Sequence, residues 1–284
     1  MRDTTVARVA IPARLASPRR VMRARGALLA LCSLPMALFF LVPLAALLLR
    51  VSPADVLANL VDRQVAQAIQ LSIGTTLITL ALTVLAGTPV AYLLARRRFR
   101  GRVLLDTLLD LPMVLPPAVA GIALLITFGR RGLIGQGLDA AGIQLAFTPA
   151  AVILAQTFVA APFYVKAAAA AFGTVDRELE QAAALDGAGT LGVFRHITLP
   201  LTLPALFGGA VMTWARALGE FGATIIFAGN FPGRTQTMPL AIYLGFELDL
   251  SVALTLAIVL LAISFAVLLV VKGVLRQRIQ STVA

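Results

Sequence analysis

Long runs of apolar residues recur along this chain, and they constrain its fold more than any other feature of the sequence. Such runs cover residues 27–49, 69–94, 104–128, 147–171, 201–227 and 250–271, and each is long enough to cross a bilayer as a helix. Only 13% of the 284 residues are charged, whereas a soluble domain carries about a quarter. The sequence therefore predicts an all-α, polytopic membrane protein with six transmembrane helices.

The basic residues are distributed unevenly around these runs. They are dense before the first run, between the second and third, and after the last: Arg2, Arg8, Arg14, Arg19, Arg20, Arg23, Arg25, Arg96, Arg97, Arg98, Arg100, Arg102, Lys272, Arg276 and Arg278. The loops on the opposite side carry only Arg50, Arg63, Arg130, Arg131 and Arg234. Because cytoplasmic loops are enriched in Lys and Arg, both termini and residues 172–200 are predicted to be cytoplasmic.

The net charge of +11 raises the question of a nucleic-acid partner. Binding of single strands uses aromatic side chains between the basic ones, and that interleaving is missing here. Anionic lipid of the inner leaflet explains the arginines better. We therefore predict contact with the membrane and no binding of nucleic acid.

Three regions are predicted along the chain. Residues 1–25 form a disordered basic cytoplasmic tail, residues 26–278 the transmembrane domain, and residues 279–284 a cytoplasmic C-terminus. The first apolar run exceeds the usual length of a signal peptide and is followed by no clear cleavage site, so we expect it to be retained. Cys32 is the single cysteine, which excludes an intrachain disulfide and suits a small packing residue.

No catalytic constellation is visible in the sequence. Lys166 and Lys272 are the only lysines and neither follows a glycine, so the chain has no G-x-x-x-x-G-K phosphate loop. His196 and Cys32 are the only residues of their types, which leaves no metal site, and no G-x-S-x-G motif is present. We predict that the chain is not an enzyme and binds no cofactor or metal, and that a partner subunit hydrolyses any ATP used.

A polar stretch interrupts the apolar sequence at residues 180–200, EQAAALDGAGTLGVFRHITLP. Alanines at 182–184 form a flat helix face, and Gly187 allows the chain to turn out of that helix. Pro200 suits the first turn of the next helix. The stretch therefore predicts a short helix, a turn and a second helix, an arrangement that fits a groove of a partner protein.

This stretch resembles the cytoplasmic coupling loop of ABC importer permeases, whose pattern is E-A-A, three residues, G, nine residues, I-x-L-P. Ala182 and Ala183 match the alanines and Gly187 the glycine, and the closing motif is matched by Ile197, Leu199 and Pro200. Gln181 stands at the glutamate position, with Glu180 immediately before it. The resemblance implies that an ATPase docks on a loop at about 173–200. The alternative is a solvated loop without a partner.

Two further segments resemble the molybdate permeases, with the sulfate permeases close behind. The first is residues 111–121, LPMVLPPAVAG, and the second is residues 214–243, WARALGEFGATIIFAGNFPGRTQTMPLAIY. Prolines remove backbone donors and bend helices, so Pro112, Pro116 and Pro117 predict a kink or break in the third span. The L-P-P-x-V-A-G run favours molybdate or tungstate over sulfate.

Charged residues inside the apolar runs are candidates for a translocation pathway. Arg216 and Glu220 lie four residues apart and share one helix face, either as a local ion pair or as part of the pathway together with Pro116 and Pro117. Lys166 is expected to extend toward the cytoplasmic interface. Asp106 and Asp110 are expected to balance the arginines at 96–102.

The loop at residues 230–238, NFPGRTQTM, lies outside the cytoplasm in the predicted topology. Pro232 and Gly233 indicate a turn. Arg234, Thr235 and Gln236 offer donors for an extracytoplasmic binding protein, although an ordinary solvated loop has the same composition.

Taken with the resemblance, these features predict the permease subunit of an ABC importer in the cytoplasmic membrane of a bacterium or archaeon. The resemblance implies a homodimer of permeases, an ATPase dimer that holds ATP and Mg²⁺, and a binding protein that delivers a molybdate-like oxyanion. A sulfate importer is the alternative within the family. A secondary transporter or channel driven by an ion gradient is the alternative from another class.

Overall fold

A computed structural model describes residues 18–283, and it describes the side chains of residues 31–273. Every regular element in this part of the chain is helical. The first helix, α1 (Pro18–Arg50), forms one unit, and the chain from Val51 onward forms a second. Residues 1–17 of the predicted tail lie outside the described residues, whereas residues 18–25 already belong to α1.

Long apolar helices account for most of the predicted spans. Besides α1, they are α3 (Arg63–Arg96), α7 (Pro149–Thr174), α10 (Leu199–Leu218) and α13 (Leu250–Val283). The third predicted span is divided into α4 (Arg102–Val114) and α5 (Pro117–Phe128), which meet at an angle of 117°. Within the described residues, five helices are thus long and apolar enough to cross a membrane, and the number is six if the bent pair is counted as one span. The predicted break in the third span is confirmed.

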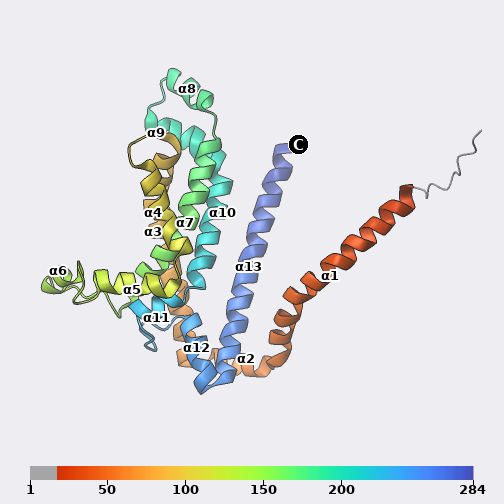
Figure 1. Cartoon of the computed structure of the whole chain (residues 1–284), viewed down its shortest axis with the longest axis vertical. Coiled ribbons are helices and arrows are strands. Elements are labelled where there is room, and N and C mark those ends of the chain that lie inside the picture. Colours follow the sequence, from red (N-terminus) through yellow and green to blue (C-terminus); the bar gives the residue numbers. More distant parts are fainter. Residues whose placement is uncertain (1–17, 284) are drawn as a thin grey trace, which may run out of the picture. The chain divides into compact units, whose positions relative to one another are not determined.

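Short helices connect the long ones. They are α2 (Pro53–Leu60), α6 (Gly135–Ala140), α8 (Arg177–Leu185), α9 (Thr190–Val193), the π-helical turn η1 (Phe194–Thr198), α11 (Gly222–Phe227) and α12 (Met238–Leu248). Within the second unit, α8 and α9 lie at one end of the long helices, and α12 lies at the opposite end (Figure 1). We refer to these as the α8 end and the α12 end.

The centre of the second unit is formed by α3, α7 and α10, which pack against one another. Their shared core combines small residues such as Ala91 and Ala168 with the rings of Tyr164 and Phe172. Small residues allow helix backbones to approach closely where lipid, rather than water, surrounds the bundle. Thr79 of α3 adds a polar contact, since its hydroxyl donates to the side-chain oxygen of Gln156 on α7 (3.1 Å).

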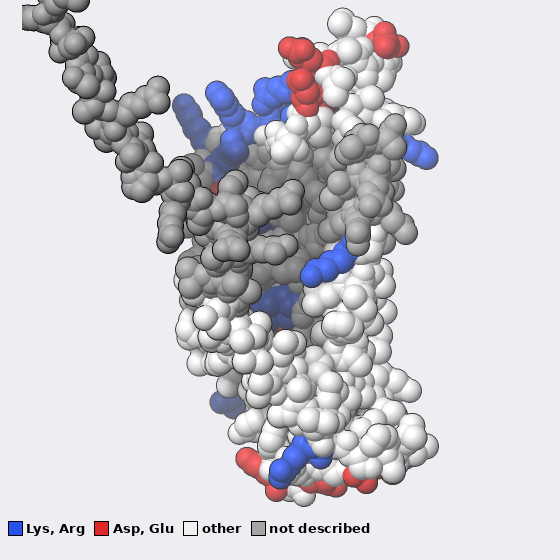
Figure 2. Space-filling view, turned by 90° about the vertical axis from the view of Figure 1, so that its right-hand side faces the viewer, with Lys and Arg blue, Asp and Glu red and all other residues white. Residues whose placement is uncertain are grey.

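The surface agrees with a position in a membrane. Charged side chains gather toward the two ends of the second unit, and a mostly uncharged surface lies between them (Figure 2). Large apolar side chains on α3, such as Leu82 and Leu85, are exposed there. Such side chains would be unfavourable in water and are expected against lipid.

The fifth predicted span, 201–227, is wrong at its C-terminal end. The helix that contains α10 stops at Leu218, and α11 is a separate helix. The break follows from Glu220, whose buried carboxylate accepts a hydrogen bond from the backbone N–H of Ala223 (2.8 Å) at the start of α11. This side chain gives the new helix a partner for one of its free donors, so a second helix can begin.

Candidate functional site

The coupling loop, residues 173–200, begins with a helix whose N-terminus is well provided with acceptors. Asp176 is the N-cap of α8, and its carboxylate accepts from the backbone N–H of Glu178 (2.9 Å). Glu178 and Glu180 lie in the first turn, where negative charge interacts favourably with the helix dipole. The sequence before the alanines therefore specifies where this helix starts.

The helix ends in a Schellman motif at Gly187. The N–H of Gly187 donates to the carbonyl of Ala184 (3.1 Å), and the N–H of Ala188 donates to the carbonyl of Ala183 (3.0 Å). Gly187 has φ 91°, a left-handed conformation in which an L side chain is strained. A Cβ at this position would meet no atom within 4 Å, so the requirement for glycine comes from the backbone angle and not from crowding. The predicted turn is confirmed.

The second helix of the loop starts earlier than predicted. Helical structure runs without a gap from Thr190 to Leu218, so Pro200 does not mark a helix start. The turn before it, η1, is π-helical, with the N–H of Leu199 donating to the carbonyl of Phe194. A π turn contains one residue more than an α-helical turn. Pro200 can therefore follow it with less steric conflict between its ring and the preceding turn.

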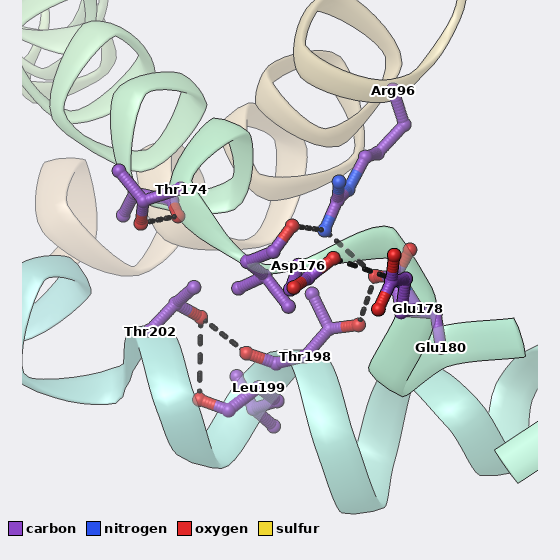
Figure 3. Close-up of polar contacts among 10 residues, drawn as sticks. Arg96, Thr174, Asp176, Glu178, Glu180, Thr198, Leu199 and Thr202 are labelled. Atoms are coloured by element: carbon purple, nitrogen blue, oxygen red, sulfur yellow. Dashed lines mark hydrogen bonds and ion pairs between the residues drawn. The ribbon is translucent and has the colours of Figure 1, made fainter. Parts of the chain in front are cut away.

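A buried arginine ties this loop to the long helices. The Nη2 atom of Arg96, at the end of α3, donates to the carbonyl of Val175 (2.9 Å) and to Oε1 of Glu180 (2.9 Å). The same carboxylate oxygen accepts from the hydroxyl of Thr198 (2.7 Å). Figure 3 shows Arg96 and Thr198 reaching the Glu180 carboxylate from different elements. We call Arg96, Val175, Glu180 and Thr198 the clamp.

The clamp joins the ends of three spans to the coupling loop. Arg96 closes α3, Val175 caps α7, and Thr198 immediately precedes α10. The side chains of Arg96 and Glu180 are only 8% and 17% exposed, so the pair is largely removed from solvent. Within the low-dielectric interior, a charged hydrogen bond of this kind is strong and directional. The clamp therefore connects α8 to the ends of α3, α7 and α10.

The structure distinguishes Glu180 from Gln181 at the start of the E-A-A pattern. Glu180 is half-buried and holds the loop, whereas Gln181, at the position of the motif glutamate, is exposed. The sequence placed Glu180 in the site but gave no reason to select Arg96 from its basic cluster. The cluster at 96–102 looks uniform in sequence, and only the fold shows that one of its members is buried.

The outer surface of the loop carries exposed leucines among its charged residues. Leu179, Leu185 and Leu191 are 50%, 89% and 77% exposed. Ala182 is exposed as well, while Ala183 and Ile197 are half-buried. Leu199 packs against the core of α3, α7 and α10. Exposed leucines around a well-defined turn are typical of a surface that is covered by another protein.

The two segments that resemble molybdate permeases meet in space. The chain breaks at Leu115 and Pro116, and Pro117 begins α5, which packs against α11. A Cβ on Gly121 would lie 2.8 Å from the carbonyl oxygen of Ala223, and one on Gly222 would lie 2.7 Å from Cβ of Pro117. Glycine at both positions is thus required for this close approach, which brings two broken helices together.

Arg216 and Glu220 form an ion pair beside this contact. The Nη1 atom of Arg216 lies 2.7 Å from Oε2 of Glu220, and the side chains are 30% and 1% exposed. The other carboxylate oxygen caps α11 through Ala223. The pairing predicted from the spacing of four residues is confirmed. Glu220 is fully occupied by structural partners, whereas Arg216 keeps further N–H groups and some exposure.

The loop between α11 and α12 presents fewer side chains than predicted. Arg234 is exposed, but Thr235 and Gln236 are 0% and 1% exposed. The Thr235 hydroxyl accepts from the backbone N–H of Phe231 (3.1 Å), and the side-chain oxygen of Gln236 accepts from the side-chain amide Nε2 of Gln64 (3.1 Å). These bonds fold the loop inward. Of the three residues predicted to contact a binding protein, only Arg234 is exposed.

A third charged group, partly exposed, joins α7 to α4, and the sequence did not predict its pairing. Lys166 of α7 lies 2.6 Å from Asp106 and 2.9 Å from Asp110 of α4. The two aspartates bind this lysine instead of balancing the arginines at 96–102, and the lysine does not merely extend to the interface. Because Asp106 and Asp110 lie four residues apart on α4, both carboxylates are on the same side of the helix. Their partner, Lys166, is distant in sequence. Among the described residues, no group of three His, Cys, Asp or Glu side chains could hold a metal ion.

Comparison with known proteins gives a consistent family. Residues 87–280 match the family described as "Binding-protein-dependent transport system inner membrane component". A relative from Mycobacterium tuberculosis, named molybdenum transport system permease protein ModB, is 45% identical over 231 residues, which cover 81% of this chain and 88% of the relative. A protein of the same name from Escherichia coli K12 is 47% identical over 178 residues, covering 62% and 78%.

Solved structures show the same fold at low sequence identity. A bacterial ABC transporter involved in the import of the acidic polysaccharide alginate contains a chain that aligns with a TM-score of 0.72 and 17% identity, covering 91% of this chain and 99% of that chain. A chain of the MetNI methionine ABC transporter in inward-facing conformations aligns with a TM-score of 0.57 and 18% identity, covering 75% and 95%.

Proposed function

The chain belongs to the family of inner membrane components of binding-protein-dependent transport systems, and we propose that it is the permease subunit of an ABC importer for molybdate. The coupling loop carries this proposal. Its motif spacing, its Schellman turn at Gly187 and the clamp on Glu180 together present exposed leucines on a braced support. A loop without a partner would need neither the bracing nor the apolar surface.

The partner on this loop is an ATPase that the chain does not itself supply. The sequence lacks a phosphate loop, so ATP and Mg²⁺ belong to a separate ATPase dimer. When ATP draws the two ATPases together, each pulls one coupling loop, and the clamp transmits the displacement to α3, α7 and α10. Rigid-body rearrangement of this kind opens the pathway alternately to the two sides. Two copies of the permease are needed, because each contributes half of such a pathway.

The orientation follows from the charges. Lys and Arg side chains gather at the α8 end of the second unit, while acidic side chains lie at both ends (Figure 2). The positive-inside rule then assigns the α8 end and both termini to the cytoplasm. This assignment brings the coupling loop to the side on which ATP is present, in the cytoplasmic membrane of a bacterium or archaeon.

The pathway passes the contact between α5 and α11. Irregular backbone at membrane depth is tolerated where it is buried in protein or lines a cavity. The break at Pro116 and Pro117 and the break after α10 both occur at this contact, and Arg216 adds a positive charge beside it. A dianion crossing the membrane is stabilised by such a charge. Arg216 is therefore the pathway residue of this group, and Glu220 positions it.

An extracytoplasmic binding protein delivers the oxyanion to the α12 end. Exposed Arg234 offers a contact for that protein, whereas Thr235 and Gln236 support the loop from inside. Molybdate and tungstate share charge and tetrahedral shape, so the binding protein decides between them. The names of the relatives favour molybdate over sulfate.

Reconstitution tests the whole proposal. The chain, its cognate ATPase and its cognate binding protein are placed in proteoliposomes, and uptake of radiolabelled molybdate is followed. Uptake is expected only with ATP and the binding protein, and excess tungstate is expected to compete. Uptake driven by an ion gradient without the ATPase would identify a secondary transporter and overturn the proposal.

A further inference from the structure

Beside the clamp lies a basic cavity, and we propose that it receives an acidic side chain of the partner ATPase. This inference rests on the proposed function, because it assumes that an ATPase docks on the coupling loop. It adds a second contact to the docking surface, chemically different from the exposed leucines.

The cavity has a volume of about 470 Å³ and opens between the end of α3 and the coupling helices. Tyr92, Arg96 and Arg97 line it from α3 and its C-cap. The wall from α8 consists of Arg177, Glu180, Gln181 and Ala184, and the turn and α9 supply Ala188, Gly189, Thr190 and Val193. The space is large enough to admit a protein side chain.

The charges that line the cavity are unbalanced. Glu180 is its only acidic residue, and the clamp already uses that carboxylate. Arg97 and Arg177 are exposed, and neither forms an ion pair with any residue in the described part of the chain. Buried Arg96 also keeps its Nε–H group without a hydrogen-bond partner. A buried donor without a partner costs free energy unless another group supplies a hydrogen-bond acceptor.

A carboxylate is the group that fits these donors. Arginine pairs with carboxylates through planar, charge-assisted hydrogen bonds, which are shorter and stronger than neutral ones. The walls formed by α8 and α9 belong to the segment that lies at the end of the long helices (Figure 1). The cavity is thus part of the surface that the ATPase meets, and a carboxylate from that protein reaches it as the loop docks.

Such a contact would govern which ATPase is accepted. Apolar contacts through Leu179, Leu185 and Leu191 contribute affinity but discriminate poorly between related surfaces. A charged pair in a cavity fixes the register of docking, speeds association and disfavours partners that lack the acid. The basic cavity would therefore act as the specificity element of the coupling site.

The test compares two double variants with the same loss of charge. Arg97→Gln with Arg177→Gln removes the two unpaired arginines of the cavity, and Arg98→Gln with Arg100→Gln removes two exposed arginines outside it. Arg96 is left intact so that the clamp persists. Binding of the purified cognate ATPase is measured in nanodiscs of neutral lipid at low and high salt. The cavity variant is expected to bind about tenfold more weakly at low salt, with a smaller difference at high salt.

Charge reversal provides the second arm. Arg177→Glu should weaken docking further, and changing one acidic residue on the docking face of the ATPase to arginine should restore it. Equal affinity of the two double variants would overturn the inference, as would a deficit seen only in nanodiscs with anionic lipid, which would mark a lipid headgroup site. Failure of the unmodified chain to bind its ATPase at all would instead reject the proposed function itself.

Discussion

Two arginine–glutamate pairs lie inside this molecule, and they connect it at different scales. Arg96 and Glu180 are separated by 84 positions in the sequence, and Arg216 and Glu220 by four. The first pair joins the end of α3 to α8, with Val175 and Thr198 as further partners. The second joins α10 to the start of α11.

The difference lies in what the carboxylate does besides pairing. Glu180 connects α8 to the end of α3 and to the turn before α10, so its pair is suited to transmitting force. Glu220 uses its second oxygen to start a helix, so its pair is suited to fixing a break in the backbone. An ion pair thus has to be judged by all the partners of its carboxylate, and not by its distance alone.

The largest effect is expected from Arg96→Met. This change leaves the Glu180 carboxylate and the Val175 carbonyl without their buried donor, at a cost of about 3 kcal/mol in the free energy of unfolding. Uptake coupled to ATP hydrolysis should be lost even in protein that inserts. Thermal melting in detergent and uptake in proteoliposomes measure the two effects. Arg98→Met is the matched control, and full coupling in Arg96→Met would rule out force transmission through the clamp.

A slightly smaller effect, about 2–3 kcal/mol, is expected from Glu220→Ala, which removes the partner of Arg216 and the cap of α11. Glu220→Gln keeps an acceptor for the Ala223 N–H and should recover part of the loss. Exchanging the two residues should not restore stability, because an arginine at 220 cannot accept that hydrogen bond. Yield and melting temperature distinguish these variants. Complete rescue by the exchange would mean that the pair acts through charge alone.

Gly187→Val tests the turn at the C-terminal end of α8, whereas the clamp holds the first turn of that helix. A β-branched residue in the left-handed conformation should cost about 1–2 kcal/mol and disturb the orientation of α9. Binding of the ATPase should fall while membrane insertion remains normal. Gly187→Asn is the control, since asparagine tolerates this conformation. Transport at the unmodified rate by Gly187→Val would show that the turn is not needed for docking.

The smallest effect is expected from Asp110→Asn in the third charged group. Lys166 retains Asp106 at 2.6 Å, and both carboxylates are close to half-exposed. The loss in unfolding free energy should stay below about 1 kcal/mol. Melting temperatures of Asp110→Asn and of Asp106→Asn with Asp110→Asn test this. A loss of unfolding free energy as large as that of Glu220→Ala would indicate that the fold depends on this group as much as on the buried pairs.

Features that depend on neighbouring residues could be predicted from the sequence. The break at Pro116 and Pro117, the turn at Gly187 and the pair of Arg216 with Glu220 all follow from local geometry. The end of α10 was missed because apolar residues continue beyond it, and hydropathy does not register one buried carboxylate. Thr235 and Gln236 were misplaced because their polar side chains bond inward, which composition does not reveal.

The sequence by itself determined that the chain crosses a membrane and where its coupling loop turns. The apolar runs, the basic residues that flank them and the left-handed Gly187 are sufficient for these conclusions. Burial in lipid, charge and backbone angle each act on one segment at a time. Only the tertiary structure decided that Arg96, among five arginines, holds Glu180, and that Lys166 binds two aspartates. Those choices depend on which helices pack together, because packing brings charges that are distant in sequence within reach of one another.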